Sequence, residues 1–150
     1  MNDSTSYAHK AVGRFQISSW DEKVVADIDG EGTTYGEVYY PKRGISRAEV
    51  SYTYTGQVEG TSSVSYLMGY RGGDDLVLAL ERFTGSVDGH AGSCVFRHEA
   101  SHDSSSVRGH LEVVPGMGTG ELANLRGEAD LVIAGHSEDG YELVLLYDRG

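Results

Sequence analysis

The feature that most constrains this chain is an alternation of apolar and polar side chains that recurs along most of it. In 48–54, alanine, valine and two tyrosines alternate with glutamate, serine and threonine, and 64–70 shows a similar alternation. Alternation with a period of two is typical of β-strands that bury one face. Turn signals rich in glycine, at 56–60, 71–74 and 88–89, separate the alternating segments. The pattern predicts consecutive antiparallel strands joined by short turns.

Composition favours the same class of fold. Glycine accounts for 21 of 150 residues, about twice the usual share of ~7%. A glycine inside a helix costs about 1 kcal/mol relative to alanine, so glycines scattered along the chain disfavour long helices. Ten tyrosines against three phenylalanines and one tryptophan indicate strands with partly polar faces.

The strands fill one domain. Residues 1–8 are polar and are predicted to be a flexible N-terminus, and 9–150 to be a single domain. Segment 33–44 contains proline and glycine and is interpreted as a loop or an edge strand. Other strands are predicted at 15–18, 24–28, 76–86, 93–102, 108–114, 127–134 and 140–148. We therefore predict a single all-β, antiparallel eight- or nine-stranded β-barrel with little helix, since closure removes sheet edges; a β-sandwich is the alternative.

Charge and cysteine content limit the partners and the compartment. Twelve basic against 23 acidic residues give a net charge of −11, which disfavours binding to nucleic acid or to an anionic membrane. The single cysteine, Cys94, excludes an internal disulfide and fits a reducing compartment. The N-terminus has no apolar segment typical of a signal peptide, and no apolar run approaches the ~18 residues of a membrane span. We predict a cytoplasmic protein.

The Asp88-Gly89 turn sets the register of one hairpin. A two-residue loop there places Glu81 opposite Phe96 and Ala79 opposite His98. The predicted inner face of this hairpin consists of Val77, Ala79, Glu81, Phe83, Cys94, Phe96, His98 and Ala100. Its predicted outer face consists of Leu78, Leu80, Arg82, Val95, Arg97 and Glu99. The apolar outer residues Leu78, Leu80 and Val95 predict a homodimer, because such a patch is often covered by a partner.

Neighbouring turns extend the inner face. The turn at 71–74 places Tyr66 opposite Ala79, and the turn at 56–60 places Tyr52 opposite Val64. Across the serine-rich turn at 103–106, His98 meets Leu111. The interior is therefore expected to hold four polar side chains on adjacent strands, namely Tyr52, Tyr66, Glu81 and His98.

Glu81 and His98 admit two interpretations. A carboxylate inside a barrel is costly unless a cation or a hydrogen-bond donor partners it, so the two residues could form a purely structural pair. Alternatively they form an acid–base pair in a pocket, where burial raises the pKa of the glutamate toward neutrality.

Other chemistry is disfavoured. His98 and His102 share a face but lie four residues apart, a span of ~13 Å that is too long for one ion; His90, His110 and His136 fall on turns or on the opposite face. No metal site is predicted. Cys94 is interpreted as a small core residue, and the glycine-rich 116–120 as a bend of the barrel, since neither a lysine nor a helix follows it.

Several segments together resemble a known bacterial family. They are SWDE at 19–22, VSYTYTG at 50–56, EGTS at 59–62, YLMGY at 66–70, LERFTG at 80–85 and GMGTGELANLRG at 116–127. Over roughly 14–148 the chain resembles the family catalogued as domain-of-unknown-function family 3224. Members look like small β-barrels akin to allene oxide cyclase and dirigent proteins, with a shared glycine-rich hairpin, here 118–120 with 125–127.

The resemblance implies a class of function. The family has no general assigned activity, but the wider group of barrels includes cofactor-free cyclases and isomerases, among them Diels–Alderases, and also non-catalytic binders. The first hypothesis is a cofactor-independent cyclase or isomerase acting on a hydrophobic small molecule such as a natural-product intermediate. Glu81 or His98 would move a proton, and the substrate would contact Tyr52, Tyr66, Met68, Phe83 and Phe96.

Two alternatives remain open. The barrel could bind a small molecule without catalysis, or its interior could be filled by side chains and bind nothing. Cavity volume separates these hypotheses, because a binding site needs ~300 Å³ or more.

Overall fold

The computed structural model describes residues 7–103, 106–134 and 139–150, and over these residues the chain is all-β without a helix. The strands are β1 (His9–Asp27), β2 (Gly32–Tyr35), β3 (Val38–Pro41), β4 (Arg43–Gly56), β5 (Val58–Arg71), β6 (Asp75–Val87), β7 (His90–His102), β8 (Ser106–Val113), β9 (Thr119–Gly120), β10 (Arg126–Ala134) and β11 (Tyr141–Asp148). In the described part of the chain, no helix is long and apolar enough to cross a membrane.

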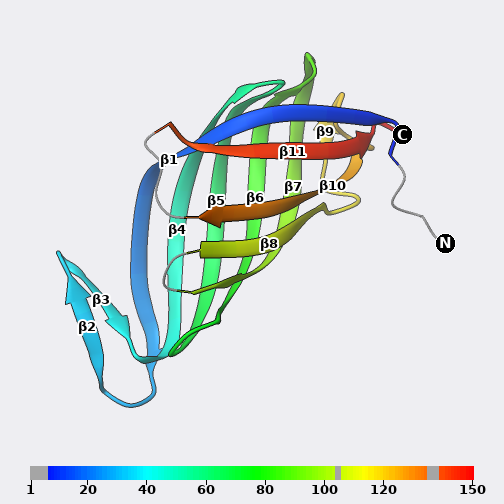
Figure 1. Ribbon diagram of the computed structural model, residues 1–150. Helices are drawn as coiled ribbons and strands as arrows, with labels where there is room; N and C mark the ends of the chain where they lie inside the picture. Colours follow the sequence, from blue (N-terminus) through cyan, green and yellow to red (C-terminus); the bar gives the residue numbers. More distant parts are fainter. Residues whose placement is uncertain (1–6, 104–105, 135–138) are drawn as a thin grey trace.

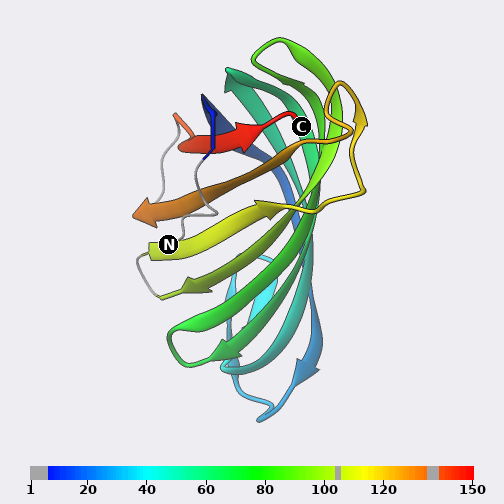
Figure 2. The same cartoon turned by 90° about the vertical axis from the view of Figure 1, so that its right-hand side faces the viewer.

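Eight strands close into an antiparallel barrel (Figures 1 and 2). Their order is β6-β5-β4-β1-β11-β10-β8-β7, and β7 pairs back with β6. The short strand β9 adds to the edge of β7, where Thr119 pairs with Ser93. The prediction of an all-β, antiparallel barrel of eight or nine strands is confirmed.

The register across β5, β6 and β7 agrees with the turn signals. Glu81 lies opposite Phe96 and Ala79 opposite His98, as the Asp88-Gly89 turn predicts. Tyr66 also pairs with Ala79, and His98 with Leu111 on β8. Asp88 itself has a φ of 49°, the left-handed conformation that such a two-residue loop requires.

One register prediction was wrong by two residues. Tyr52 pairs with Ser62, and Val64 pairs with Val50 instead. The expected turn at 56–60 is tighter than the glycines indicate, because β4 continues to Gly56 and β5 begins at Val58. Gly60 therefore lies inside β5, where its φ is 145°. A shift of two residues preserves the face of every side chain, so Tyr52 still points inward.

The N-terminal part also differs from the sequence prediction. Segments 15–18 and 24–27 are not two strands but parts of one 19-residue strand, β1, which ends one residue before the predicted end at Ile28. Its pairing with β4 shifts register between Ile17 and Ser19 and again between Val24 and Ala26. Irregularities of this kind interrupt the alternation of side chains and bend a strand, so the sequence resembles two short strands with a linker.

Segment 33–44 is neither a loop nor an edge strand of the barrel. Its residues 33–41 belong to the β2–β3 hairpin, a separate two-stranded sheet with a turn at Gly36, and Arg43 and Gly44 begin β4. Figure 1 shows the hairpin projecting beside the lower part of β1. Tyr39 on β3 donates to the Asp27 carboxylate at 2.6 Å, and the Arg43 guanidinium pairs with Asp29 at 2.5 Å. The first contact fastens the hairpin to the barrel, and the second joins the segment after β1 to the start of β4.

The core lies on the inward face of the barrel strands, and it includes Phe83, Phe96, Leu111, Leu143 and Leu145. One predicted surface residue is misplaced. Val95 is only 7% exposed, because the chain leaving β8 folds back along β7, where the Val114 N–H donates to the Val95 carbonyl at 2.8 Å. Residues 1–6 of the predicted N-terminus, residues 104–105 of the predicted 103–106 turn, and His136 lie outside the described residues.

Candidate functional site

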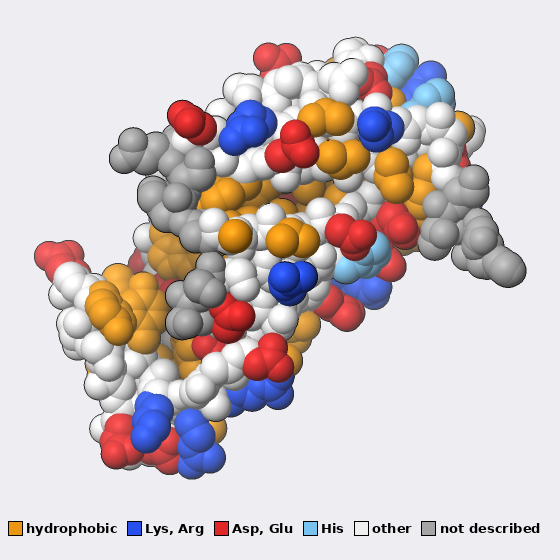
Figure 3. Space-filling view, viewed as in Figure 1, with side chains coloured by type: hydrophobic (Ala, Val, Ile, Leu, Met, Phe, Trp, Pro, Cys, Tyr) orange, Lys and Arg blue, Asp and Glu red, His pale blue; other side chains and the backbone are white. Residues whose placement is uncertain are grey.

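A cavity of about 670 Å³ opens at the end of the barrel where β5 leads into β6 and β7 into β8. Figure 3 shows a hollow between β11 and β10 with hydrophobic side chains inside it. The lining residues are Phe15, Ile17, Trp20, Glu22, Tyr35, Tyr40, Tyr52, Tyr66, Met68, Tyr70, Asp75, Val77, His102, Val107, Leu131 and Ile133. The volume exceeds the ~300 Å³ that a small-molecule site needs, so the interior is not completely filled.

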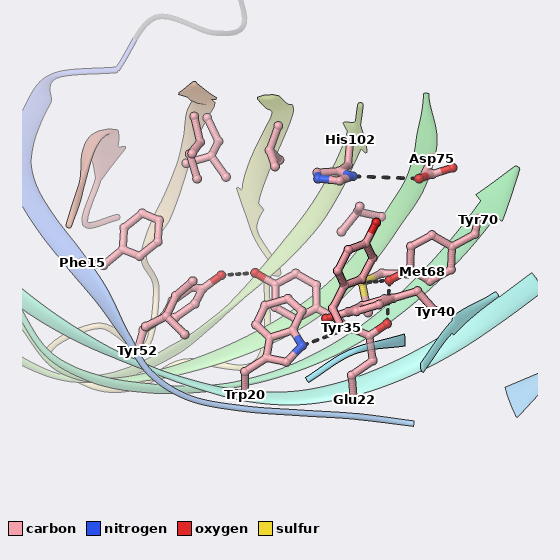
Figure 4. Close-up of a pocket in the computed structure, with 16 residues that line it drawn as sticks. Phe15, Trp20, Glu22, Tyr35, Tyr40, Tyr52, Met68, Tyr70, Asp75 and His102 are labelled. Carbon is pink, nitrogen blue, oxygen red and sulfur yellow. Dashed lines mark hydrogen bonds and ion pairs between the residues drawn. The ribbon is translucent and has the colours of Figure 1, made fainter. Parts of the chain in front are cut away.

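Two tyrosine hydroxyls form a polar pair in the cavity wall. The hydroxyls of Tyr52 and Tyr66 are hydrogen-bonded to each other, and Figure 4 marks this bond at Tyr52. Both side chains are buried. Tyr52 stacks on Phe15 at 4.7 Å between ring centroids, and Tyr66 on Trp20 at 5.6 Å. Burial, and secondarily the charge of Glu81, raises the pKa of Tyr66. The Tyr66 phenol is therefore neutral, and whichever phenol accepts the shared bond keeps its own O–H for another acceptor.

Glu81 is the centre of a buried polar network. Its Oε1 lies 2.7 Å from His98 Nε2, and its Oε2 accepts hydrogen bonds from Tyr54 at 2.5 Å and Ser62 at 2.6 Å. Glu81 is 0% exposed and His98 3%. The sequence prediction that these two side chains meet in the interior agrees with this geometry. Neither residue lines the cavity.

The predicted site residues thus divide into two layers. Tyr52, Tyr66 and Met68 line the cavity, whereas Phe83 and Phe96 are fully buried in the core with Glu81 and His98. Tyr66 joins the layers, because its ring meets the His98 imidazole edge-to-face at 5.9 Å. A ligand in the cavity would touch Tyr66 and not the carboxylate below it.

The sequence prediction missed the outer half of the site. Glu22 Oε1 accepts from the Trp20 indole N–H at 3.0 Å, and its Oε2 accepts from the Tyr70 hydroxyl at 2.6 Å (Figure 4). The hairpin adds Tyr35 and Tyr40, and Tyr40 meets Tyr70 edge-to-face at 6.1 Å. A usable signal is the i, i+2 spacing of Trp20 and Glu22, which places both on one face of a strand, but these residues fall between the two strands predicted at 15–18 and 24–28.

A second carboxylate lies at the rim. Asp75 Oδ2 is 3.9 Å from His102 Nδ1, and its Oδ1 accepts the Arg71 backbone N–H at 2.8 Å. The Arg71 side chain instead donates to the carbonyl of Asp74, the residue before Asp75, at 2.7 Å. Asp75 is thus held at the cavity by a backbone donor and a histidine.

Two other reactive groups lie outside the cavity. His110, Glu112 and Glu128 offer possible metal-ligand atoms within 4.8 Å of one another on β8 and β10, but His110 already pairs with Asp130 at 2.9 Å. Cys94 is buried, and this burial together with the charge of Glu81 raises the pKa of its thiol to about 12. The thiol is accordingly an inert core group.

Residues 11–145 match a family model described as "Protein of unknown function (DUF3224)". The chain belongs to the DUF3224 family. A crystal structure of a DUF3224 protein of unknown function from Shewanella oneidensis MR-1 superposes on this DUF3224 chain with a TM-score of 0.72. The two share 23% identity over 93% of this chain and 96% of the other, so they share a fold. No curated protein matches this chain.

Proposed function

We propose that this DUF3224 protein binds a hydrophobic small molecule in the cavity at the end of its barrel. The observation that carries the proposal is the cavity itself, about 670 Å³ in volume and lined mainly by aromatic and aliphatic side chains. Binding sites for small molecules have this character, with apolar walls and a few placed polar groups. Here the polar groups are the Tyr52–Tyr66 pair in the wall and the carboxylates of Glu22 and Asp75.

A cofactor-independent cyclase or isomerase is the second candidate. The paired phenols favour it, because the O–H that remains free can donate to a ligand carbonyl and polarise it. The apolar walls would hold a flexible substrate in one reactive shape, which lowers the entropic part of the barrier. Tyr66 lies between the cavity and the His98–Glu81 pair, so the pair would act on the substrate through Tyr66.

The binding proposal is tested with N-phenyl-1-naphthylamine, a neutral hydrophobic probe that fluoresces in apolar surroundings. Val77 on β6 and Leu131 on β10 both line the cavity, and the double variant Val77→Trp with Leu131→Trp fills it from both walls. The next residues along the same strands, Leu78 and Val132, are exposed on the outer face. The variant Leu78→Trp with Val132→Trp is therefore the matched control.

We expect saturable probe binding to the native protein and to the outer variant, and at least a tenfold loss in the inner variant. Circular dichroism establishes that both variants are folded. Equal binding to the two variants would place the probe outside the cavity, and absence of binding to the native protein would refute the proposal.

A further inference from the structure

The carboxylates that line the cavity are not matched by a lysine or an arginine in the described part of the same lining. Glu22 and Asp75 both line it, and among the described residues that do so there is neither a lysine nor an arginine. His102 is the only basic side chain in that lining, and it is paired with Asp75. The chain as a whole carries a net charge of −11. A negative opening with apolar walls raises the local concentration of cations and repels anions.

The same part of the cavity is lined by electron-rich aromatic rings. Trp20, Tyr35, Tyr40 and Tyr70 all line it, together with Tyr66. Trp20 is 43% exposed and Tyr35 68%, so ring surface remains available to a ligand. Indole and phenol faces attract ammonium groups, and aromatic cages are the usual recognition element for quaternary ammonium.

Glu22 places a carboxylate among these rings. Its oxygens accept one hydrogen bond from Trp20 and one from Tyr70, whereas an ionised carboxylate offers about four acceptor positions. Acceptor capacity is therefore left for a ligand. The two bonds also fix the carboxylate beside the rings, and the charge polarises the indole and phenol that donate to it.

We infer that the ligand of this cavity carries a cationic amine or quaternary ammonium at one end of an apolar body. The cationic end lies among Trp20, Tyr40 and Tyr70 beside Glu22, and the apolar body lies on the other side of the cavity, toward Phe15 and Tyr52 (Figure 4). This assignment rests on the proposed binding function and specifies the chemical class of the ligand.

The test uses three probes of nearly identical shape. Benzyltrimethylammonium is cationic, neopentylbenzene replaces its nitrogen by carbon, and benzylsulfonate carries an anionic tetrahedral group on the same benzyl body. Trp20 is the single tryptophan of the chain and lines the cavity, so its fluorescence reports binding directly. Displacement of N-phenyl-1-naphthylamine gives an independent measurement.

We expect benzyltrimethylammonium to bind at least tenfold more tightly than neopentylbenzene, and benzylsulfonate to bind more weakly than either. The variant Glu22→Gln keeps the shape and one acceptor oxygen but removes the charge, and its amide N–H can donate to the Tyr70 hydroxyl in place of the bond that the carboxylate accepts there. It should weaken the cation at least fivefold and leave neopentylbenzene unchanged. Asp75→Asn should also weaken binding of the cation, to a smaller extent. It replaces Glu22→Gln as the test variant if Glu22→Gln is poorly folded.

The control is Glu49→Gln, which removes one negative charge from an exposed carboxylate bonded to Ser65 on the barrel exterior. It should leave all three affinities unchanged. If neopentylbenzene binds as tightly as the cation, or if Glu49→Gln weakens the cation as much as Glu22→Gln does, the cationic assignment is overturned while the binding function stands. If none of the probes binds in the cavity, the binding function itself fails.

Discussion

Glu81 and His98 lie 2.7 Å apart in the barrel interior, joined through Oε1 and Nε2. The second carboxylate oxygen accepts from Tyr54 and Ser62. Because these four residues come from β6, β7, β4 and β5 respectively, one carboxylate ties four consecutive strands together. The network is fully enclosed, and it lies beneath the cavity and not in its wall.

Substitution of the central carboxylate should therefore affect stability more than binding. Breaking a buried pair on one side costs about 3–5 kcal/mol, and a glutamine here offers one acceptor oxygen where the carboxylate offers two. We expect Glu81→Gln to lower the melting temperature strongly, while the folded fraction binds N-phenyl-1-naphthylamine as the native protein does. Thermal unfolding and probe titration should be measured on the same samples, with Glu49→Gln as the surface control. Unchanged stability with lost binding would instead assign Glu81 a direct role toward the ligand.

The phenol pair should recognise a carbonyl. Tyr66→Phe removes one hydroxyl of the pair and keeps the ring that stacks on Trp20. We expect this variant to lose affinity for 2-acetylnaphthalene by about tenfold, the effect of one hydrogen bond of ~1.4 kcal/mol. Affinity for 2-isopropenylnaphthalene, which has the same shape but no acceptor, should not change. Equal losses for the two compounds would indicate a packing effect and count against a hydrogen bond from the pair.

Buried neutral acids should make the protein sensitive to alkali. Burial raises the pKa of Tyr54 and Tyr66, and raises that of Cys94 to about 12. In the unfolded chain these groups ionise near pH 10 for tyrosine and ~8.5 for cysteine, so above these values the unfolded state holds fewer protons than the folded state. Below pH ~8 these groups are protonated in both states and the free energy of unfolding keeps its full value. At higher pH the free energy of unfolding falls, by up to about 1.4 kcal/mol per pH unit for each group.

Guanidinium unfolding between pH 7 and 11 measures this dependence. Tyr66→Phe removes one of the titrating groups. Between pH 10 and 11 it should make the fall in the free energy of unfolding with pH less steep, by the equivalent of up to one proton. A free energy of unfolding that stays constant over that interval would show that these groups ionise equally well in both states.

The outer face of β5 and β6 should form a dimer contact. Leu67, Leu76, Leu78 and Leu80 are each about half exposed, and Leu67 pairs directly with Leu78 across the two strands. We expect light scattering to give twice the 16.2 kDa chain mass, and the double variant Leu78→Ser with Leu80→Ser to give the monomer. Val132→Ser, at an exposed position on β10, is the control. A native protein that stays at the monomer mass across micromolar concentrations contradicts the prediction.

The hairpins of β5, β6 and β7 could be predicted from local sequence. A two-residue Asp88-Gly89 loop admits few backbone conformations, and it fixes which residues of the flanking strands lie opposite each other. Since side chains alternate between faces, this register also brings Glu81, His98 and Tyr66 into the interior. The turn before Val58 is shorter in the structure than the sequence predicts. The predicted register there is wrong by two residues, but the predicted face of each side chain is correct.

Local sequence could not separate the wall of the cavity from the core beneath it. Both layers consist of inward-facing residues with the same alternation, and the difference is their height along the barrel. That height depends on strand pairs far apart in the sequence, such as β1 with β11. Likewise, the register shifts in β1 that place Trp20 and Glu22 at the cavity are set by pairing with β4.

The sequence by itself thus determined the class of fold, the faces of the central strands and the meeting of Glu81 with His98, because turn chemistry and side-chain alternation act over a few residues. The tertiary structure decided that Tyr66 and not Glu81 meets the cavity, that the β2–β3 hairpin brings Tyr40 to its opening, and that Val95 is covered. These outcomes arise from closure of the barrel and from chain segments folding back over it, and such long-range contacts leave no periodic signal in the sequence.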